Sequence, residues 1–366
     1  MSENKYEYDY PVTLCDLLTI AATRGASDLH LVCGYPPSLR IDGKITVLEY
    51  PYIKPYQMEA MLFSILENWQ KETLETKWEL DFSFSINGVA RFRGNIMRQR
   101  GTYAAAFRVV PYTIPPFETL GLPSEIKNLC NLTRGLVLVT GATGSGKSTT
   151  LASLIDIINK TRCLSIITIE DPIEFLHRHN KSTVKQREIG ADTHSFQDAL
   201  KHVLRHDPDV ILIGEMRDKE SISIALTAAE TGHLVFSTLH TQTAPQTISR
   251  IVDAFSDDNK DHIRQQLAGS LKAVISQQLI PMNSGNGRVV AVEYMISTPA
   301  IRNLIREGKD HQLYSAIQTG HNYGMCTMDQ SLVKLYKQGK ISYESVYEYC
   351  IDRAEVDRLI NRSYIG

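Results

Sequence analysis

The segment from Gly141 to Ser148 carries the most chemically specific residues of this sequence. It reads Gly-Ala-Thr-Gly-Ser-Gly-Lys-Ser and fits the pattern G-x-x-x-x-G-K-[ST]. Its glycines allow backbone conformations that a Cβ would block, so successive N–H groups can point at one anion. Lys147 adds a mobile positive charge for β- and γ-phosphates, and the Ser148 hydroxyl can bind Mg²⁺. The segment therefore predicts a phosphate site.

The elements expected on either side of this loop favour a phosphate site over a glycine-rich turn that fits the pattern by chance. The apolar run 136–139 predicts a buried strand before the loop. Apolar residues then recur at helical spacing through 151–158, which predicts a helix whose positive dipole end faces the anion. We expect the nucleotide to be bound by Thr143, Gly144, Ser145, Gly146, Lys147, Ser148 and Thr149.

Polar groups also follow three other apolar runs. The run 166–169 is followed by Glu170, Asp171 and Glu174, the run 210–213 by Gly214 and Glu215, and the run 234–236 by Ser237, Thr238 and His240. In an open parallel sheet, ligands bind at the carboxyl ends of the strands. We therefore expect these groups to lie near the phosphate loop.

The carboxylates among these groups suit nucleotide hydrolysis, which needs a Mg²⁺ ligand and a group that orients or deprotonates the attacking water. Glu215 is the first candidate for the water and Glu170 the second. A metal-binding Asp is usual immediately before such a Glu, but Gly214 stands there. The expected metal ligands are therefore Ser148, Glu215 and Asp171. The alternative for Glu170 and Asp171 is a solvated loop.

Histidines and arginines supply the remaining candidates. His233 and His240 flank one predicted strand, where an imidazole could contact a γ-phosphate; a hydrogen-bonded structural histidine is the alternative. Two strands before residue 111 are rich in arginine, whose fork suits the charge of a transferring phosphoryl group. A solvated basic strand face is the alternative for these arginines, which are Arg91, Arg93, Arg98, Arg100 and Arg108.

The order of predicted elements indicates more than one domain, as a length of 366 residues suggests. Short alternating strands and helices before residue 111 predict an α+β domain, 1–111. Three prolines between 111 and 116 predict a linker, 112–122. Apolar strands that alternate with helices predict an α/β domain, 123–366, mostly helical from about Lys260, with a hairpin near 283–287 and a helical subdomain from about 285.

Composition limits the classes of partner. The net charge is −2 and 22% of residues are charged, so the chain has no basic footprint for bulk nucleic-acid binding, and we expect no nucleic-acid partner. The six cysteines are scattered and predict reduced thiols in a cytosolic protein. No run of 18 apolar residues occurs and the N-terminus is polar, so we expect membrane association only through partners.

With these residues identified, the chain resembles the secretion ATPases of type II secretion and type IV pili, and within them the branch that retracts pili. The resemblance covers nearly the whole chain. It rests on Gly25–Leu31, the phosphate loop, the "Asp box" Thr168–Phe175, the Walker B region Asp207–Asp218, the "His box" Thr231–Thr241, the retraction-type segment Ala300–Glu307 and Gly324–Gln330.

The resemblance implies a RecA-like P-loop ATPase core with a smaller PAS-like N-terminal domain. It further implies a cytoplasmic homo-hexamer, peripheral to the inner membrane, that hydrolyses Mg-ATP to withdraw pilin and docks on a pilus platform protein. It assigns catalytic or sensing roles to Glu215, Glu170, His233 and His240, pairs Arg93 with Arg108, and makes Gly214 the family's own pattern. The absence of the extra N-terminal domain of extension motors favours retraction.

Two other functions stay open at this point. The family also contains accessory members, so the chain could be a nucleotide-gated adaptor that regulates another pilus motor. A nucleic-acid translocase on the same core is the third possibility, which the near-neutral charge disfavours.

Overall fold

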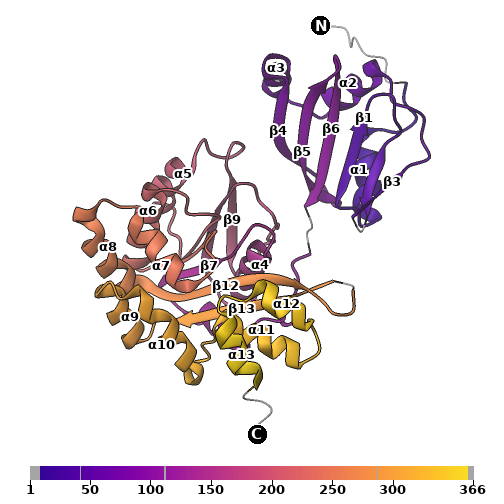
Figure 1. The fold of residues 1–366 in the computed structure, drawn as a ribbon. Helices are drawn as coiled ribbons and strands as arrows, with labels where there is room; N and C mark the ends of the chain where they lie inside the picture. Colours follow the sequence, from indigo (N-terminus) through magenta and orange to yellow (C-terminus); the bar gives the residue numbers. More distant parts are fainter. Residues whose placement is uncertain (1–8, 42, 111–112, 286, 362–366) are drawn as a thin grey trace. The chain divides into compact units, whose positions relative to one another are not determined.

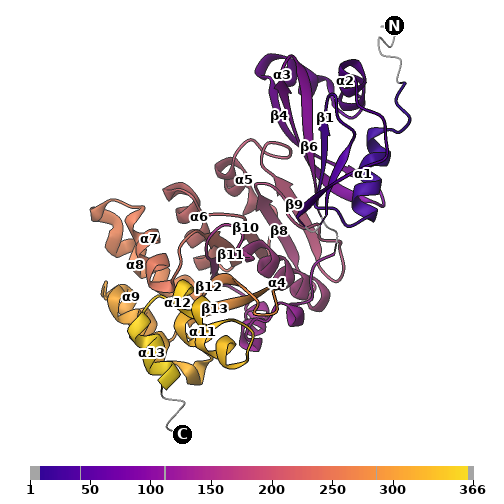
Figure 2. The same cartoon turned by 45° about the vertical axis from the view of Figure 1, so that its right-hand side comes forward.

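The computed structural model describes residues 9–41, 43–110, 113–285 and 287–361 (Figures 1 and 2). The chain divides into two compact units. The first comprises Met1–Thr113 with Glu174–Leu176, and the second comprises Ile114–Ile173 with His177–Gly366. The division follows Thr113, while residues 111 and 112, where the boundary was predicted, lie outside the described residues.

The first unit contains an antiparallel six-stranded sheet in the order β3-β2-β1-β6-β5-β4. Its strands are β1 (Asp28–Val32), β2 (Ser38–Ile41), β3 (Lys44–Val47), β4 (Glu79–Ile86), β5 (Ala90–Gln99) and β6 (Thr102–Val110). Its helices are α1 (Leu14–Thr23), α2 (Pro55–Phe63) and α3 (Asn68–Lys77). Asp42-Gly43, between β2 and β3, is a dipeptide typical of a hairpin turn, but residue 42 lies outside the described residues.

Period-two alternation sets the two faces of this sheet. In β5, Phe92, Gly94 and Ile96 are buried while Arg93 and Asn95 are exposed. The buried side chains pack with residues of all three helices into one apolar core. The arginines of β5 and β6 are therefore carried on a rigid sheet, where strand register fixes which of them face each other.

The second unit contains a seven-stranded sheet in the order β13-β12-β7-β11-β10-β8-β9. Neighbouring strands are parallel except for β12 and β13, which form an antiparallel pair. The strands are β7 (Gly135–Thr140), β8 (Ser165–Glu170), β9 (Thr183–Glu188), β10 (Val210–Ile213), β11 (Leu234–Leu239), β12 (Leu271–Pro281) and β13 (Arg288–Ile296). All residues of β7, β10 and β11 are buried, as expected for central strands covered on both faces.

Helices cover both faces of this sheet. Apolar residues of α4 and η2 pack on one face, and those of α5 to α10 pack on the other. α11, α12 and α13 form a third cluster with residues of β12 and β13 (Figure 1). The elements are α4 (Lys147–Thr161), α5 (Phe196–Val203), α6 (Lys219–Glu230), α7 (Ala244–Asp253), α8 (Asp257–Ser270), α9 (Pro299–Arg306), α10 (Leu313–Thr319), α11 (Met328–Lys337), α12 (Tyr343–Tyr349), α13 (Arg353–Asn361), and the 3-10 turns η1 (Phe117–Thr119), η2 (Ser124–Asn131), η3 (Asp310–Gln312) and η4 (His321–Tyr323).

Two expectations from the sequence need correction, and one strand was not predicted. The expected linker 112–122 includes η1, because Phe117 is buried in the core of the second unit. The helical C-terminal part starts at α9, since the region after 285 first adds β13 to the sheet. The polar edge strand β9 was not predicted, because only Val184 and Glu188 of its six residues are buried. The hairpin expected near 283–287 joins β12 and β13, but residue 286 lies outside the described residues.

Candidate active site

The phosphate loop follows β7 and enters α4 at Lys147. Gly141 has a φ of 140°, and a Cβ there would lie 2.3 Å from the carbonyl oxygen of Gln277, so only glycine fits. Lys147 is buried and its Nζ donates to the carbonyls of Gly141 (2.7 Å) and Ala142 (2.9 Å). The ammonium group is thus held within the loop, where a phosphate could replace these carbonyl partners.

The other predicted nucleotide-binding residues lie along the same loop and the first turn of α4. Thr143 and Gly144 are exposed at the loop tip, whereas Ser145 is buried and its Oγ has no partner among the described residues. Residues 141–145 line a cavity of about 420 Å³ together with Gln242, 277–279, Arg288 and 348–350. That volume is in the range of small-molecule sites.

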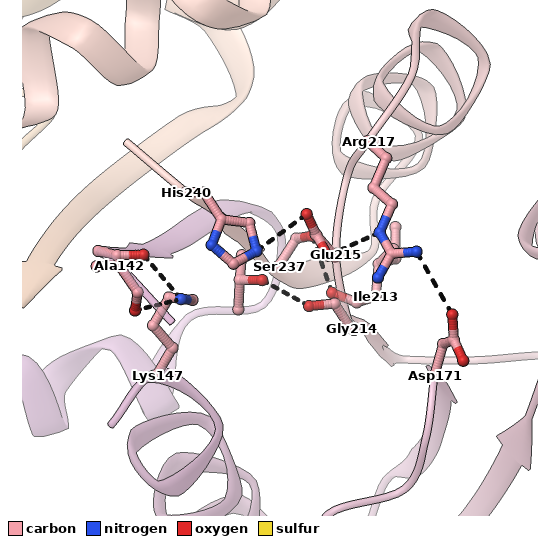
Figure 3. Close-up of polar contacts among 11 residues, drawn as sticks. Ala142, Lys147, Asp171, Ile213, Gly214, Glu215, Arg217, Ser237 and His240 are labelled. Atoms are coloured by element: carbon pink, nitrogen blue, oxygen red, sulfur yellow. Dashed lines mark hydrogen bonds and ion pairs between the residues drawn. The ribbon is translucent and has the colours of Figure 1, made fainter. Parts of the chain in front are cut away.

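Glu215 and His240 meet at the edge of the sheet that carries this loop. β10 and β11 are parallel neighbours with Ile213 opposite Ser237, so residues just beyond the two strands emerge together. Glu215 Oε1 lies 3.1 Å from His240 Nε2 (Figure 3). The Glu215 side chain is 20% exposed and that of His240 48%, so both remain accessible to a ligand. The predicted convergence of these two groups is therefore seen in the structure.

Arg217 is a third member of this group that the sequence analysis did not select. Its Nε donates to Glu215 Oε2 at 2.8 Å, and its NH1 lies 3.5 Å from Asp171 Oδ2 (Figure 3). The hydrogen bond to Glu215 raises the pKa of Arg217, so the guanidinium stays charged. The sequence feature that could have identified Arg217 is its position, two residues after the candidate catalytic carboxylate Glu215.

The presence of glycine at position 214, where an Asp is usual, has a steric explanation. Its N–H donates to the carbonyl of Ile169 at 2.8 Å, and a Cβ there would lie 3.2 Å from that oxygen and 3.3 Å from Glu170 Cα. β10 and β8 approach each other too closely here for a larger residue without a shift of backbone. An Asp before Glu215 would therefore be crowded.

Glu170 and His233 form contacts with residues other than the Glu215–His240 pair. Glu170 is held by other side chains, and His233 lies at the other end of β11. Glu170 Oε1 accepts hydrogen bonds from Thr168 Oγ1 (2.6 Å) and Gln186 Nε2 (3.1 Å), which hold the carboxylate at the ends of β8 and β9. His233 precedes β11, at the opposite end of the strand from His240. Its Nδ1 lies 3.0 Å from the Ala228 carbonyl. Within one chain the structure brings His240, and not His233, to the phosphate-loop edge.

Arg93 and Arg108 belong to the first unit and lie directly opposite each other in the β5–β6 ladder. Arg108 Nε donates to Asp28 Oδ1 at 3.0 Å, and the Asp28 side chain is 10% exposed. Arg93 is exposed and has no ion pair within the described part of the chain. The spacing that the resemblance implied therefore corresponds to a cross-strand pair.

The predicted metal ligands do not form a preassembled site. Over residues 9–361, apart from positions 42, 111, 112 and 286, no three His, Cys, Asp or Glu side chains converge in a way that could hold a metal ion. Mg²⁺ commonly takes one or two protein carboxylates or hydroxyls and completes its shell with phosphates and water. A small donor set of Ser148 and Glu215 fits that mode of binding.

Comparison with known proteins decides the family. The model of the family described as type II/IV secretion system protein matches residues 113–346. The chain belongs to that family. Its predicted RecA-like ATPase core, smaller α+β N-terminal domain and helical C-terminal region are confirmed as the family's fold.

Individual relatives of this family match most of the chain. The "Type IV pilus retractation ATPase PilT" of Pseudomonas aeruginosa is 51% identical over 335 residues, 92% of this chain and 97% of the relative. A "Twitching motility protein" of Neisseria gonorrhoeae is 49% identical over 309 residues, 84% and 83% of the two chains. A solved structure of the pilus retraction motor PilT with bound ADP has a TM-score of 0.89 at 50% identity and covers 95% of this chain and 99% of its own.

Among the helices of the described residues, none is both long enough and apolar enough to cross a bilayer.

Proposed function

We propose that this chain hydrolyses Mg-ATP and uses the free energy released to withdraw a type IV pilus. The observation that carries the proposal is the 3.1 Å contact between Glu215 and His240 at the sheet edge that also bears the phosphate loop. The relatives named above support it, since one is a retraction ATPase and another is a retraction motor with bound ADP.

In this proposal each group has a separate task. Lys147 and the loop amides bind the β- and γ-phosphates, and Ser148 with Glu215, aided by Asp171, would hold Mg²⁺. When bound there, Mg²⁺ would supply positive charge against the developing charge on the phosphate oxygens. Glu215 accepts a hydrogen bond from the attacking water and orients it. His240, through its other ring nitrogen, reports whether a γ-phosphate is present.

Glu170, Arg93 and Arg108 complete the proposed set. Glu170 is the second carboxylate at the strand ends, and the arginines stabilise the charge of the transferring phosphoryl group. His233, at the opposite end of β11 with its Nδ1 3.0 Å from the Ala228 carbonyl, takes the alternative role of a hydrogen-bonded structural histidine. The working assembly is a homo-hexamer that acts in the cytoplasm on an inner-membrane pilus platform protein, so that membrane association comes through that partner.

The proposal is tested with the purified full chain and in cells. Phosphate release from ATP should require Mg²⁺ and stop when the metal is chelated with EDTA. In a piliated strain with this chain as its only retraction motor, pili should shorten. An accessory adaptor would bind ATP but fail to retract pili alone. A nucleic-acid translocase would be accelerated by added DNA.

A further inference from the structure

Glu293, in the middle of β13, is a fully buried carboxyl group outside the site described above. The residue is 0% exposed. Its Oε1 accepts a hydrogen bond from the backbone N–H of Ala244 at 2.6 Å. Its Oε2 has no hydrogen-bond partner among the described residues. This short contact joins β13 to the first residue of α7.

Ala244 is the far end of the segment that carries His240. Residues 240–243 run from the end of β11 to α7, and Thr243 caps the helix by accepting from the Gln246 amide. Gln242 in this segment lines the cavity beside the phosphate loop. β11 fixes one end of the segment and the Glu293 contact fixes the other, so the path of His240 depends on both.

The strand register places Glu293 next to the start of the phosphate loop as well. Glu293 is opposite Ser276 in β12, and Ser276 is opposite Thr140, the last residue of β7. Thr140 Oγ1 donates to Ser276 Oγ at 2.9 Å. All three side chains are completely buried. A row of polar groups therefore crosses three strands between the residue before Gly141 and the helix that follows His240.

Stability does not account for a carboxyl group at this position. Burial raises the pKa of Glu293 to about 7, the amides of Ala244 and Met328 oppose that rise, and Asp329 adds to it. Taking a carboxylate out of water without a full set of partners is unfavourable, and apolar groups of similar volume are often neutral or stabilising at such sites. The groups that gain from Glu293 are the amides of Ala244 and Met328, and Ala244 lies at the end of the His240 segment.

We propose that Glu293 is a positioning residue that holds the Ala244 amide, and through it keeps the His240 segment aligned with Glu215. The inference rests on the ATPase function proposed above. Glu293 touches neither nucleotide nor water in this account, so its loss should slow turnover without weakening ATP binding.

The test uses Glu293→Met, which keeps the length of the side chain but has no acceptor, and Glu293→Gln, which keeps an acceptor oxygen. In the full chain, Glu293→Met should lower kcat about tenfold with KM for ATP within about twofold. Its thermal midpoint should stay within a few degrees of that of the wild type, because removing the buried carboxyl group offsets the cost of leaving the Ala244 amide without its acceptor. Glu293→Gln should retain turnover within about threefold, because its amide oxygen can still accept from Ala244.

A double-mutant cycle with His240→Ala then separates positioning from packing. If Glu293 acts through His240, Glu293→Met should change kcat less than twofold in the His240→Ala background. Equal tenfold losses in both backgrounds would overturn the inference, because Glu293 would then act independently of His240. The absence of ATPase activity in the wild type would instead overturn the proposed function.

Discussion

Glu215 and His240 lie 3.1 Å apart across the ends of two parallel strands, and Arg217 binds the other oxygen of the same carboxylate at 2.8 Å. One carboxylate is thus held by an imidazole and a guanidinium at the edge where the phosphate loop begins. Two directional contacts from different sides fix its orientation. This constraint is what a group that positions an attacking water requires.

His240→Ala should lower kcat for ATP hydrolysis about tenfold or more, because Glu215 then loses one of the two contacts that orient it. The Kd for ATP should change little, since Lys147 and the loop amides are untouched. Steady-state phosphate release and nucleotide titration measure the two effects. The exposed His262→Ala on α8 is the matched control and should behave as wild type. A full rate in His240→Ala would remove this residue from the site.

Lys147→Ala should weaken ATP binding about tenfold to a hundredfold, because a charge-assisted contact to phosphate contributes about 1.5–3 kcal/mol. A fluorescent ATP analogue titrated against the purified chain gives the Kd. Lys160→Ala is the control on the same helix, where the lysine is exposed and pairs with Asp156. Equal affinities of the two variants would contradict the assignment of residues 141–148 to phosphate.

Arg93→Ala and Arg108→Ala should both lower kcat more than ATP affinity, if they stabilise charge in the transition state. Only Arg108→Ala should also destabilise the first unit, by about 1 kcal/mol or less, because the mostly buried Asp28 loses its 3.0 Å partner. Denaturant unfolding compares the two variants. Matched losses of affinity and kcat in both would argue against contacts made in the transition state.

The buried carboxyl of Glu293 should make stability depend on pH. Its pKa is about 7 in the folded chain and near 4.5 ordinarily, so the native state holds a proton that the unfolded state has lost between these values. Wild-type stability from this group therefore falls as pH rises from 4.5 to 7, by about 3 kcal/mol in all. Glu293→Met has no carboxyl group at this position, so its stability should not show this fall with pH.

Thermal unfolding of both proteins at pH 5 and pH 8 tests that sign. The midpoint of Glu293→Met relative to wild type should increase on going to pH 8. If the midpoint of Glu293→Met relative to wild type decreased on going to pH 8, the folded state would favour the charged carboxylate, which contradicts the prediction.

The convergence at the active site was predictable because of sheet topology. Apolar runs at 136–139, 210–213 and 234–236 identified parallel central strands, and the carboxyl ends of such strands share one edge. That rule places Glu215 and His240 together without any knowledge of side-chain positions. The same rule shows why His233 is separate, since it precedes the strand that His240 follows.

Other features depended on packing that no local pattern encodes. Arg217 contacts both Glu215 and Asp171 where β10 and β8 approach closely at Gly214, and no local pattern indicates that approach. β12 and β13 lie in a region expected to be mostly helical, and only their hairpin was predicted. Glu293 occupies a strand position that would suit an apolar residue, and its contact with Ala244 forms only when α7 is placed against β13.

The most direct test of the account is the fate of ATP bound to Glu215→Gln, compared with Glu220→Gln, an exposed residue on α6 that pairs with Lys201. Each variant of the purified chain is incubated with Mg-ATP, and bound nucleotide and released phosphate are measured over time. We expect Glu215→Gln to retain intact ATP with kcat reduced about a hundredfold or more, while Glu220→Gln turns over like wild type. Wild-type turnover by Glu215→Gln would contradict the central claim.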